Sequence, residues 1–343
     1  MDRSDDNQTR PAGRIPSISM VAREAGVSTA TVSRIINGVT NKASPETVER
    51  VREVVARTGY RPSSAGQTLR RRESRLVALI AANLSNPAMS AIAASVEVAL
   101  REKGYVMVLC DSHDQPGLQD EYLREMKAQA VRGFVLLGAV KSPVLDAMDA
   151  AGEPMVFVNR TNPYGRPSVH VGIDNEVAGR EVAVFLHGKG VTEALVIHGA
   201  LASSATAARV AAFRAEFRQL TGAEAQAMGS DDLDHLGIGY DRMREWLAAQ
   251  CRAPQAAFCL SDLIAYGAGR ALREGDHRGC LLTGFDDNPL NDWVAPDLAS
   301  VRVPYEEFGP VIVQSITRLW DGERDFGVHL PHRLVVRNST LQT

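Results

Sequence analysis

The stretch VAREAGVSTATVSRIING, residues 21–38, decides how the N-terminal part of the chain folds. Val21 and Ala25 recur at the spacing of one helical face, and Gly26 is the residue type that ends a helix. Ser28 is placed to cap a second helix, so about four residues join the two helices. A turn this short sets the helices at a steep angle, which indicates a helix-turn-helix arrangement.

The next two helices complete a small all-α domain. The second helix is expected over Thr29–Asn37, with its core face formed by Val32, Ile35 and Ile36. Its outward face is expected to present Thr29, Ala30, Ser33 and Arg34. A third helix begins at Ser44-Pro45-Glu46, a cap followed by a proline at the first helical position, and ends at Gly59. Its valines are expected to close a three-helix core, at positions 48, 51, 54 and 55.

Charge is distributed unevenly along the chain. Residues 1–75 carry 14 Lys and Arg against 8 Asp and Glu, a net charge of +6, whereas residues 76–343 carry 24 against 33, a net charge of −9. A basic segment on an acidic body favours a polyanion as the partner of one part only. The arginine run that ends at Arg75 would alone indicate a solvated tether, but its place beside a DNA-reading module favours a binding element.

Residues 21–38, followed by SPETVERVREVVARTGYRPSSAGQTLR at residues 44–70, resemble the headpiece and hinge of the lactose/purine repressor (LacI) family. The resemblance covers essentially the whole chain. It implies a bacterial-type transcription regulator, a repressor, that binds double-stranded operator DNA in the cytoplasm. It also implies a headpiece over residues 16–62, a hinge over residues 63–73 and an effector-binding and dimerisation domain over residues 74–343.

The same resemblance implies which residues touch DNA. In this family the recognition helix enters the major groove, and a hinge leucine, matched by Leu69, wedges into the minor groove. The positions that approach base edges are Thr29, Ala30 and Arg34, of which Arg34 has the geometry for a bidentate contact to guanine. The positions suited to phosphate oxygens are Ser28, Thr31, Ser33 and Asn37.

Two residues depart from the family pattern. Met20 stands where the family usually has an acidic residue that completes a capping box with Ser17, so a weaker cap on the first helix is expected. Gly66 lies inside the hinge helix and costs roughly 1 kcal/mol relative to alanine. Ordering of the hinge is therefore expected to depend strongly on DNA.

Beyond Arg75 the chain alternates apolar β-branched runs with amphipathic helical stretches. The predicted strands are Leu76–Ala82, Val106–Cys110, Phe134–Leu137, Met155–Val158, Ala194–Ile197, Ala256–Leu260 and Leu281–Phe285. This alternation indicates an α/β domain with parallel sheets covered by helices, and its length allows two sheets. The resemblance implies a two-lobed type I periplasmic-binding-protein fold with three crossovers. Its N-lobe would take residues 74–171 and 305–332, and its C-lobe residues 172–301 and 333–343.

Polar residues follow the predicted strands, where ligands bind in open α/β sheets. These residues are Asp111, Asn159-Arg160, Asp174, Ser261-Asp262 and Asp286-Asp287. The resemblance, carried over position by position, implies that the effector is bound by Asn159, Arg209, Ser261, Asp286 and Tyr305. The alternative for Asp262 and Asp286 is that they cap helices or fix loops, and for Arg209 that it forms a surface ion pair.

The expected effector is a sugar, a sugar acid or a similar small polar metabolite. The loop Asn86-Pro87-Ala88-Met89 lacks the aromatic residues that often form a platform for a sugar ring in this family, which weakens the prediction of a sugar. An acid is favoured if Arg209 has no carboxylate partner within the protein.

Two other classes of protein were weighed. An enzyme is disfavoured because the sequence holds no GxSxG, Walker A or GxGxxG motif, and no catalytic residue, metal site or cofactor is expected. His329 and His332 flank a proline in a connecting segment, which favours structural histidines over metal ligands. A solute-binding protein for transport is disfavoured because there is no signal peptide and the basic headpiece is attached.

The sequence also predicts a cytoplasmic homodimer. No stretch approaches the roughly 18 apolar residues of a membrane span, so no membrane partner is expected. Two headpieces would read the half-sites of a near-palindromic operator, and no leucine heptads follow the last strand to favour a tetramer. The four cysteines, which are far apart in sequence, are predicted to be reduced core residues: Cys110, Cys251, Cys259 and Cys280.

Overall fold

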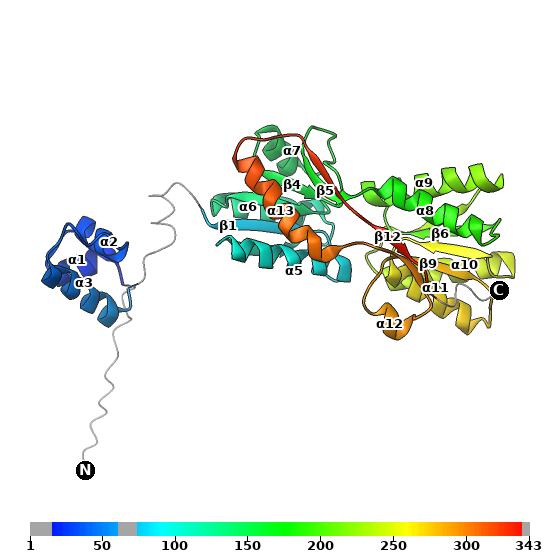
Figure 1. Cartoon of the computed structure of the whole chain (residues 1–343), viewed down its shortest axis with the longest axis horizontal. Helices are drawn as coiled ribbons and strands as arrows, with labels where there is room; N and C mark the ends of the chain where they lie inside the picture. Colours follow the sequence, from blue (N-terminus) through cyan, green and yellow to red (C-terminus); the bar gives the residue numbers. More distant parts are fainter. Residues whose placement is uncertain (1–15, 61–73, 338–343) are drawn as a thin grey trace, which may run out of the picture. The chain divides into compact units, whose positions relative to one another are not determined.

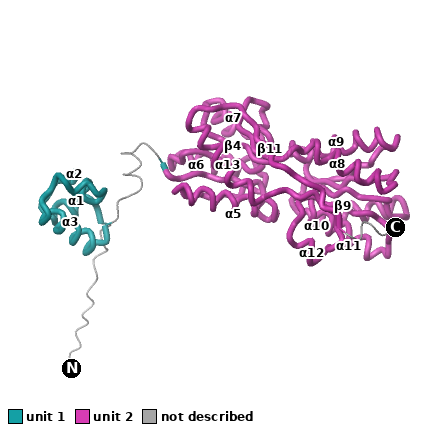
Figure 2. Tube along the Cα trace, in the orientation of Figure 1, with its two compact units in different colours: residues 1–74 teal, residues 75–343 magenta. Residues whose placement is uncertain are grey.

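The computed structural model describes residues 16–60 and 74–337, and the chain divides into two compact units at Ser74 (Figures 1 and 2). The hinge residues Gly66 and Leu69 lie outside the described residues, so the predictions for them remain predictions. Within the described part of the chain, no helix is long and apolar enough to cross a membrane.

The first unit is a bundle of three helices: α1 (Ile18–Ala25), α2 (Thr29–Ile36) and α3 (Pro45–Thr58). Each begins at a serine whose side chain accepts a hydrogen bond from the backbone N–H three residues later, which satisfies one unpaired donor of the first turn. The cap of α1 therefore forms without an acidic residue at Met20. Gly26 and Gly59 end α1 and α3 in the left-handed region, as the sequence predicted for helix ends.

One prediction for α2 is wrong. Ser33 does not point outward but is 6% exposed, because it lies three residues before Ile36 and therefore on the edge of the same buried face. The helix also ends one residue early, and Asn37 turns back so that its side-chain amide donates to the Ser33 carbonyl at 2.6 Å. Two further predicted core residues, Ile36 and Val55, are only half-buried and pack against the edge of the core. The buried core consists of other apolar side chains: Val21, Ala22, Ala25, Val32, Ile35, Val48, Val51 and Val54.

The second unit contains two six-stranded sheets, which define an N-lobe and a C-lobe. The N-lobe sheet has the order β11-β5-β4-β3-β1-β2, with β1 (Leu76–Ala81), β2 (Val106–Asp111), β3 (Gly133–Leu137), β4 (Met155–Val158), β5 (Val169–Ile173) and β11 (Gly327–Leu330). The C-lobe sheet has the order β12-β10-β9-β8-β6-β7, with β6 (Ala194–His198), β7 (Gln226–Gly229), β8 (Ala256–Cys259), β9 (Leu281–Asp286), β10 (Ala299–Arg302) and β12 (Arg333–Val335). All pairs are parallel except β10 with β12.

Helices cover both faces of each sheet, which is why the strands are apolar on both sides. In β1, Leu79 packs toward one face and Ile80 toward the other, and both are buried. The N-lobe helices are α5 (Pro87–Glu102), α6 (Pro116–Ala128), α7 (Pro143–Ala150) and α13 (Tyr305–Trp320). The C-lobe helices are α8 (Asn175–Gly188), α9 (Ser204–Thr221), α10 (His235–Gln250), α11 (Asp262–Glu274) and the short α12 (Asn291–Val294).

The chain passes between the two sheets three times: from β5 to α8, from β10 to α13, and from β11 to β12. The three crossovers and the mainly parallel sheets confirm the fold class expected from the sequence. The sheets meet so that the carboxyl ends of their central parallel strands face the region between the lobes (Figure 1).

The predicted strands are all present, within one residue at each end. Of the four cysteines predicted to lie in the core, only Cys259 is buried, whereas Cys110 and Cys280 are half-buried. The prediction is wrong for Cys251, which is exposed and ends α10 in a left-handed conformation. All four thiols are free.

Candidate ligand cleft and nucleic-acid interface

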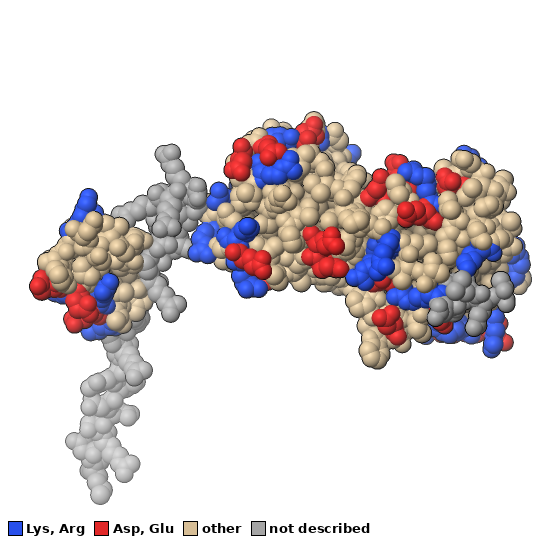
Figure 3. Space-filling view, in the orientation of Figure 1, with Lys and Arg blue, Asp and Glu red and all other residues tan. Residues whose placement is uncertain are grey.

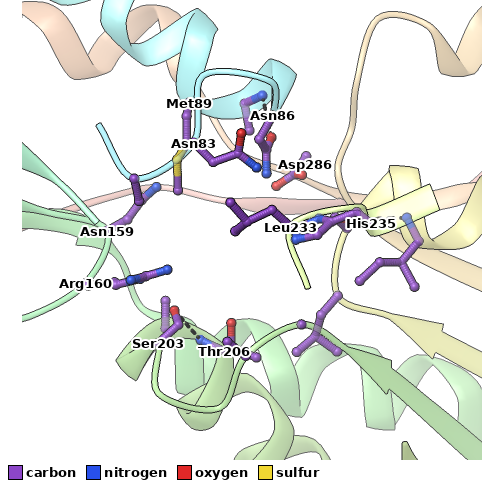
Figure 4. A pocket seen from close by; sticks show the side chains of 18 of the residues that line it. Asn83, Asn86, Met89, Asn159, Arg160, Ser203, Thr206, Leu233, His235 and Asp286 are labelled. Atoms are coloured by element: carbon purple, nitrogen blue, oxygen red, sulfur yellow. Dashed lines mark hydrogen bonds between the residues drawn. The ribbon is translucent and has the colours of Figure 1, made fainter. Parts of the chain in front are cut away.

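A cavity of about 110 Å³ lies between the lobes, at the carboxyl ends of the parallel strands. Side chains reach it from both lobes, with Asn83 and Asn86 on one side and Ser203 and Thr206 on the opposite side (Figure 4). All of the side chains predicted to bind an effector line it: Asn159, Arg209, Ser261, Asp286 and Tyr305. The tertiary structure therefore brings together residues that are up to 146 positions apart in the sequence.

Arg209 reaches the cavity from α9, and two contacts fix its guanidinium. Its Nε donates to Asn175 Oδ1 at 2.7 Å, and its central carbon lies 3.5 Å from the centre of the Phe285 ring. Arg209 forms no ion pair with a carboxylate of the described residues. The alternative role considered for it from the sequence, a surface ion pair, is therefore wrong. Burial lowers the pKa of Arg209, and the nearby Asp286 opposes that shift.

The position of α9 depends on Gly179 of α8. A Cβ at Gly179 would lie 2.6 Å from the Arg209 carbonyl oxygen, which is backbone and has little freedom to move. The absence of a side chain at this glycine lets the two helices approach closely enough to hold the Arg209 backbone against the lobe.

Asp286 ends β9 and is the most strongly perturbed carboxyl in the cavity. Tyr305 Oη donates to its Oδ1 at 2.6 Å. Burial raises the pKa of Asp286 to about 7, and the neighbouring Asp262 adds to this shift, while Arg209 and Tyr305 oppose it. Its backbone φ of 108° is rare for a residue with a side chain. Strain and a shifted pKa in a polar cavity are together typical of a ligand site.

Ser261 and Asp262, which begin α11, have different roles. Ser261 Oγ caps α11 by accepting from the Ile264 N–H at 3.2 Å, and it lies 2.9 Å from Nδ1 of His235. Asp262 does not line the cavity, because it accepts hydrogen bonds from the Asn288 N–H, the Asn291 side chain and the Ser300 hydroxyl. It fixes the loop after β9, which was the alternative considered for it from the sequence. Burial raises the pKa of Asp262 to about 6.

The sequence reasoning did not find several cavity residues. Asp114 forms a bidentate ion pair with Arg160, at 2.6 and 2.8 Å, with side chains 19% and 11% exposed. Asn83 and Ser203 follow β1 and β6 by only a few residues, so the rule that ligands bind after parallel strands could have included them. The pairing of Asp114 with Arg160 had no signal in the sequence.

Other polar residues after the strands stabilise turns instead. Asp111 accepts from the Leu84 N–H at 2.9 Å, and Asp174 caps α8 by accepting from the Val177 N–H at 2.9 Å. His329 is exposed on β11, and His332 Nε2 lies 3.2 Å from Glu181. Within residues 16–60 and 74–337, no three His, Cys, Asp or Glu side chains are arranged to hold a metal ion.

The exposed face of α2 is the candidate nucleic-acid interface. Ser28, Thr29, Ala30, Arg34 and Asn37 are exposed, whereas Thr31 is half-buried. Ser33 is buried and its carbonyl accepts from Asn37, so a direct phosphate contact from the Ser33 side chain is disfavoured.

The charge of Arg34 also favours the exposed face of α2 as the nucleic-acid interface. Arg34 forms no hydrogen bond or ion pair within the described residues, whereas Arg52 and Arg57 of α3 pair with Glu49 and Glu24. Over the second unit acidic and basic side chains are interspersed on the face in view (Figure 3).

A helix-turn-helix unit on the same polypeptide as a two-lobed domain with a polar cleft is typical of a class of transcription regulators. Residues 17–63 match the family described as "Bacterial regulatory proteins, lacI family", and residues 77–291 match "Periplasmic binding protein domain". The chain belongs to the LacI family of bacterial regulatory proteins, and it is a DNA-binding transcription regulator rather than an enzyme.

The chain aligns with individual relatives over nearly the whole length of both sequences. The chain is 32% identical to the transcriptional regulator CelR of Thermobifida fusca, over 95% of this chain and 98% of that one. It is 29% identical to the transcriptional regulator PtxS of Pseudomonas putida, over 94% and 95%. A Lac repressor dimer bound to operator and the anti-inducer ONPF shares the fold, with a TM-score of 0.81, 23% identity, and coverage of 95% and 99%. A CelR–cellobiose complex has a TM-score of 0.67, 28% identity, and coverage of 94% and 99%.

Proposed function

We propose that this protein represses transcription in the cytoplasm as a homodimer bound to a near-palindromic operator, and that a small polar metabolite in the cleft changes its operator affinity. The observation that carries the proposal is that the cavity is built from both lobes, with Asn159 from one and Arg209 and Asp286 from the other. A ligand that contacts both lobes binds one relative arrangement of them better than another. If operator binding also depends on that arrangement, the two affinities are linked.

The relatives support both halves of the proposal. Lac repressor has been solved as a dimer bound to operator, and CelR as a complex with cellobiose. The proposed domain limits are 16–62 for the headpiece, 63–73 for the hinge and 74–343 for the effector-binding domain, and the division of the chain after Ser74 supports a boundary near the start of the third. Direct DNA contacts are proposed for the exposed residues of α2 and for Leu69 of the hinge.

The proposal is tested by selecting genomic DNA fragments with purified full-length protein at several salt concentrations, with and without a metabolite extract of bacterial cells. Enrichment of a near-palindrome that weakens with salt, and whose affinity changes with the extract, is expected. An enriched site whose affinity no extract changes would contradict the ligand-responsive half of the proposal.

Replacing Arg34 with alanine is expected to weaken binding to the selected operator by about 1–3 kcal/mol, or roughly 5- to 150-fold, because a bidentate contact to a base is lost. Binding to unrelated DNA should weaken much less. Arg52→Ala is a matched control, since it removes the same charge from an exposed side chain of α3 whose partner among the described residues is Glu49. Equal losses in the two variants, measured by fluorescence anisotropy, would show that Arg34 contributes only charge.

A further inference from the structure

The two arginines that line the cavity differ in what neutralises them. Arg160 is held by both oxygens of Asp114 and by the Gly138 carbonyl, so its charge is already compensated within the protein. Arg209 has no such partner among the described residues. Arg209 is therefore a half-buried cationic group that faces the cleft with no protein anion paired to it among the described residues, and a charge withdrawn from water is costly unless an anion accompanies it.

Arg209 is also held in an orientation suited to an anion. Its Nε is used by Asn175, and Phe285 covers one face of its guanidinium. The two terminal nitrogens make no hydrogen bond within the described residues. A fixed guanidinium with its paired terminal N–H groups available matches the two oxygens of a carboxylate, and little side-chain entropy remains to be lost on binding.

The one carboxyl near Arg209 does not fill this role. Asp286 accepts a hydrogen bond from Tyr305 and forms no ion pair with Arg209. Because burial raises the pKa of Asp286 to about 7, a large fraction of this carboxyl is protonated at neutral pH. The charge of Arg209 is therefore only partly balanced there.

The remaining lining fits hydroxyl groups rather than a flat ring. Asn83 and Asn86 lie across the cavity from Ser203 and Thr206, and these groups both donate and accept hydrogen bonds (Figure 4). Tyr305 is the one Trp, Tyr or Phe side chain among the lining residues, and its hydroxyl is used by Asp286. The cavity volume, about 110 Å³, is below the roughly 300–1,000 Å³ typical of pockets for drug-sized ligands.

We propose that the cleft binds an open-chain polyhydroxy monocarboxylate, such as a five- or six-carbon aldonate, with its carboxylate on Arg209 and its hydroxyls on the amides and hydroxyls opposite. This inference rests on the proposed function, because it names the chemical class of the effector. It assigns to Arg209 the discrimination of an acid from the corresponding neutral polyol.

The charges around Asp286 give the inference a second consequence. The titratable and charged groups near Asp286 are Arg209 of α9, Asp262 and Tyr266 of α11, and Tyr305 of α13. An added anion on Arg209 places negative charge near Asp286 and raises its pKa further, so that binding takes up protons. Affinity for the acid should then fall as the pH rises from 6 to 8, by less than tenfold per pH unit, whereas affinity for a neutral polyol should not fall.

The test uses full-length protein and isothermal titration at pH 6.5. Sodium D-gluconate, D-galactonate and D-xylonate are compared with D-sorbitol, D-galactitol and D-xylitol. We expect at least one acid to bind at least 100-fold more tightly than its alditol, and to change operator affinity. Tighter binding of an alditol, or no binding of any acid while a cell extract still changes operator affinity, would overturn this inference alone. If no extract changes operator affinity, the ligand-responsive half of the proposed function fails.

Variants separate recognition from folding. Arg209→Gln should lose at least 100-fold in affinity for the acid, and Arg209→Lys should recover only part of it, because lysine lacks the paired N–H groups. Arg218→Gln, on an exposed side chain of the same helix, should leave the affinity unchanged. Asp286→Asn should bind the acid without the decrease between pH 6 and 8, which a purely structural role would not produce. A decrease that persists in Asp286→Asn would overturn the assignment of the proton.

Discussion

Replacing Gly239 with alanine is expected to destabilise the second unit by about 2 kcal/mol. A Cβ at this position of α10 would meet the Ile264 carbonyl group of α11, and a backbone group cannot rotate away as a side chain can. Alanine gains about 1 kcal/mol from its better helix propensity, whereas overpacking against a backbone group this close costs about 3 kcal/mol, the upper end of the usual range. The cost is therefore expected to exceed the gain.

Urea unfolding followed by tryptophan fluorescence measures this effect in the full-length protein. The three tryptophans, Trp246, Trp293 and Trp320, are all in the second unit, so the signal does not report on the headpiece. Gly188→Ala is the control, since this helical glycine has nothing within 4 Å of its Cβ position and should lose no stability. A loss in the control as large as that of Gly239→Ala would show that the crossing of α10 and α11 is not the cause.

The close contact between α10 and α11 also predicts that the stability losses of two alanine substitutions there are not additive. A Cβ at Gly267 of α11 would meet the Leu236 carbonyl of α10, in the same close approach. Once one alanine has separated the helices, the second should cost less, so the double variant should lose less stability than the sum of the single variants. Because His235 at the start of α10 contacts Ser261 at the start of α11, separation of the helices should also weaken ligand binding.

Replacing Asp286 with asparagine is expected to stabilise the second unit at pH 8 and to leave it nearly unchanged at pH 4. The folded-state pKa of about 7 lies above the ordinary value of 3.8, so the protonated carboxyl is favoured in the folded protein. The stability that this proton contributes is fully present below pH 3.8 and is lost as the pH rises toward 7. Asparagine has no proton to lose, so the gap should grow with pH to the order of 1–3 kcal/mol.

Asp262→Asn provides the contrast. Asp262 also has a raised pKa, of about 6, but its two oxygens accept three hydrogen bonds that hold the loop after β9. Asparagine has only one acceptor oxygen, so at least one buried donor loses its partner, at about 1–3 kcal/mol. Asp262→Asn should therefore lose stability even at pH 8. Urea unfolding between pH 4 and pH 8 measures both variants, and a pH-independent effect of Asp286→Asn would contradict the raised pKa.

The cost that Asp286 imposes near neutral pH has a functional explanation. Its carboxyl, which is partly withdrawn from water, and its strained backbone, with φ of 108°, both reduce stability at the residue that accepts a hydrogen bond from Tyr305 in the cleft. Residues that are retained at such a cost are typical of binding sites, and their replacement often gains stability while function is lost.

Local sequence signals predicted the elements themselves. The serine caps at positions 17, 28 and 44 and the glycines at positions 26 and 59 fixed the limits of the headpiece helices, because capping depends on residues a few positions apart. The strands that were missed include β7, β11 and β12, which are partly exposed and lack a continuous apolar run. Ser33 was wrongly predicted to be exposed, because the helical period of 3.6 residues does not determine whether a residue at the edge of the buried face is buried or exposed.

The sequence by itself determined the class of the protein, its two units, and which residue types stand at the ends of the parallel strands, because these depend on local periodicity and on motifs of short spacing. The tertiary structure alone decided how those residues are used. It paired Asp114 with Arg160 and left Arg209 without a carboxylate, and it buried Asp262 in the loop after β9 while Asp286 faced the cleft. These outcomes depend on contacts between residues far apart in the chain and on burial, which sets the cost of each charge, and neither quantity is local to the sequence.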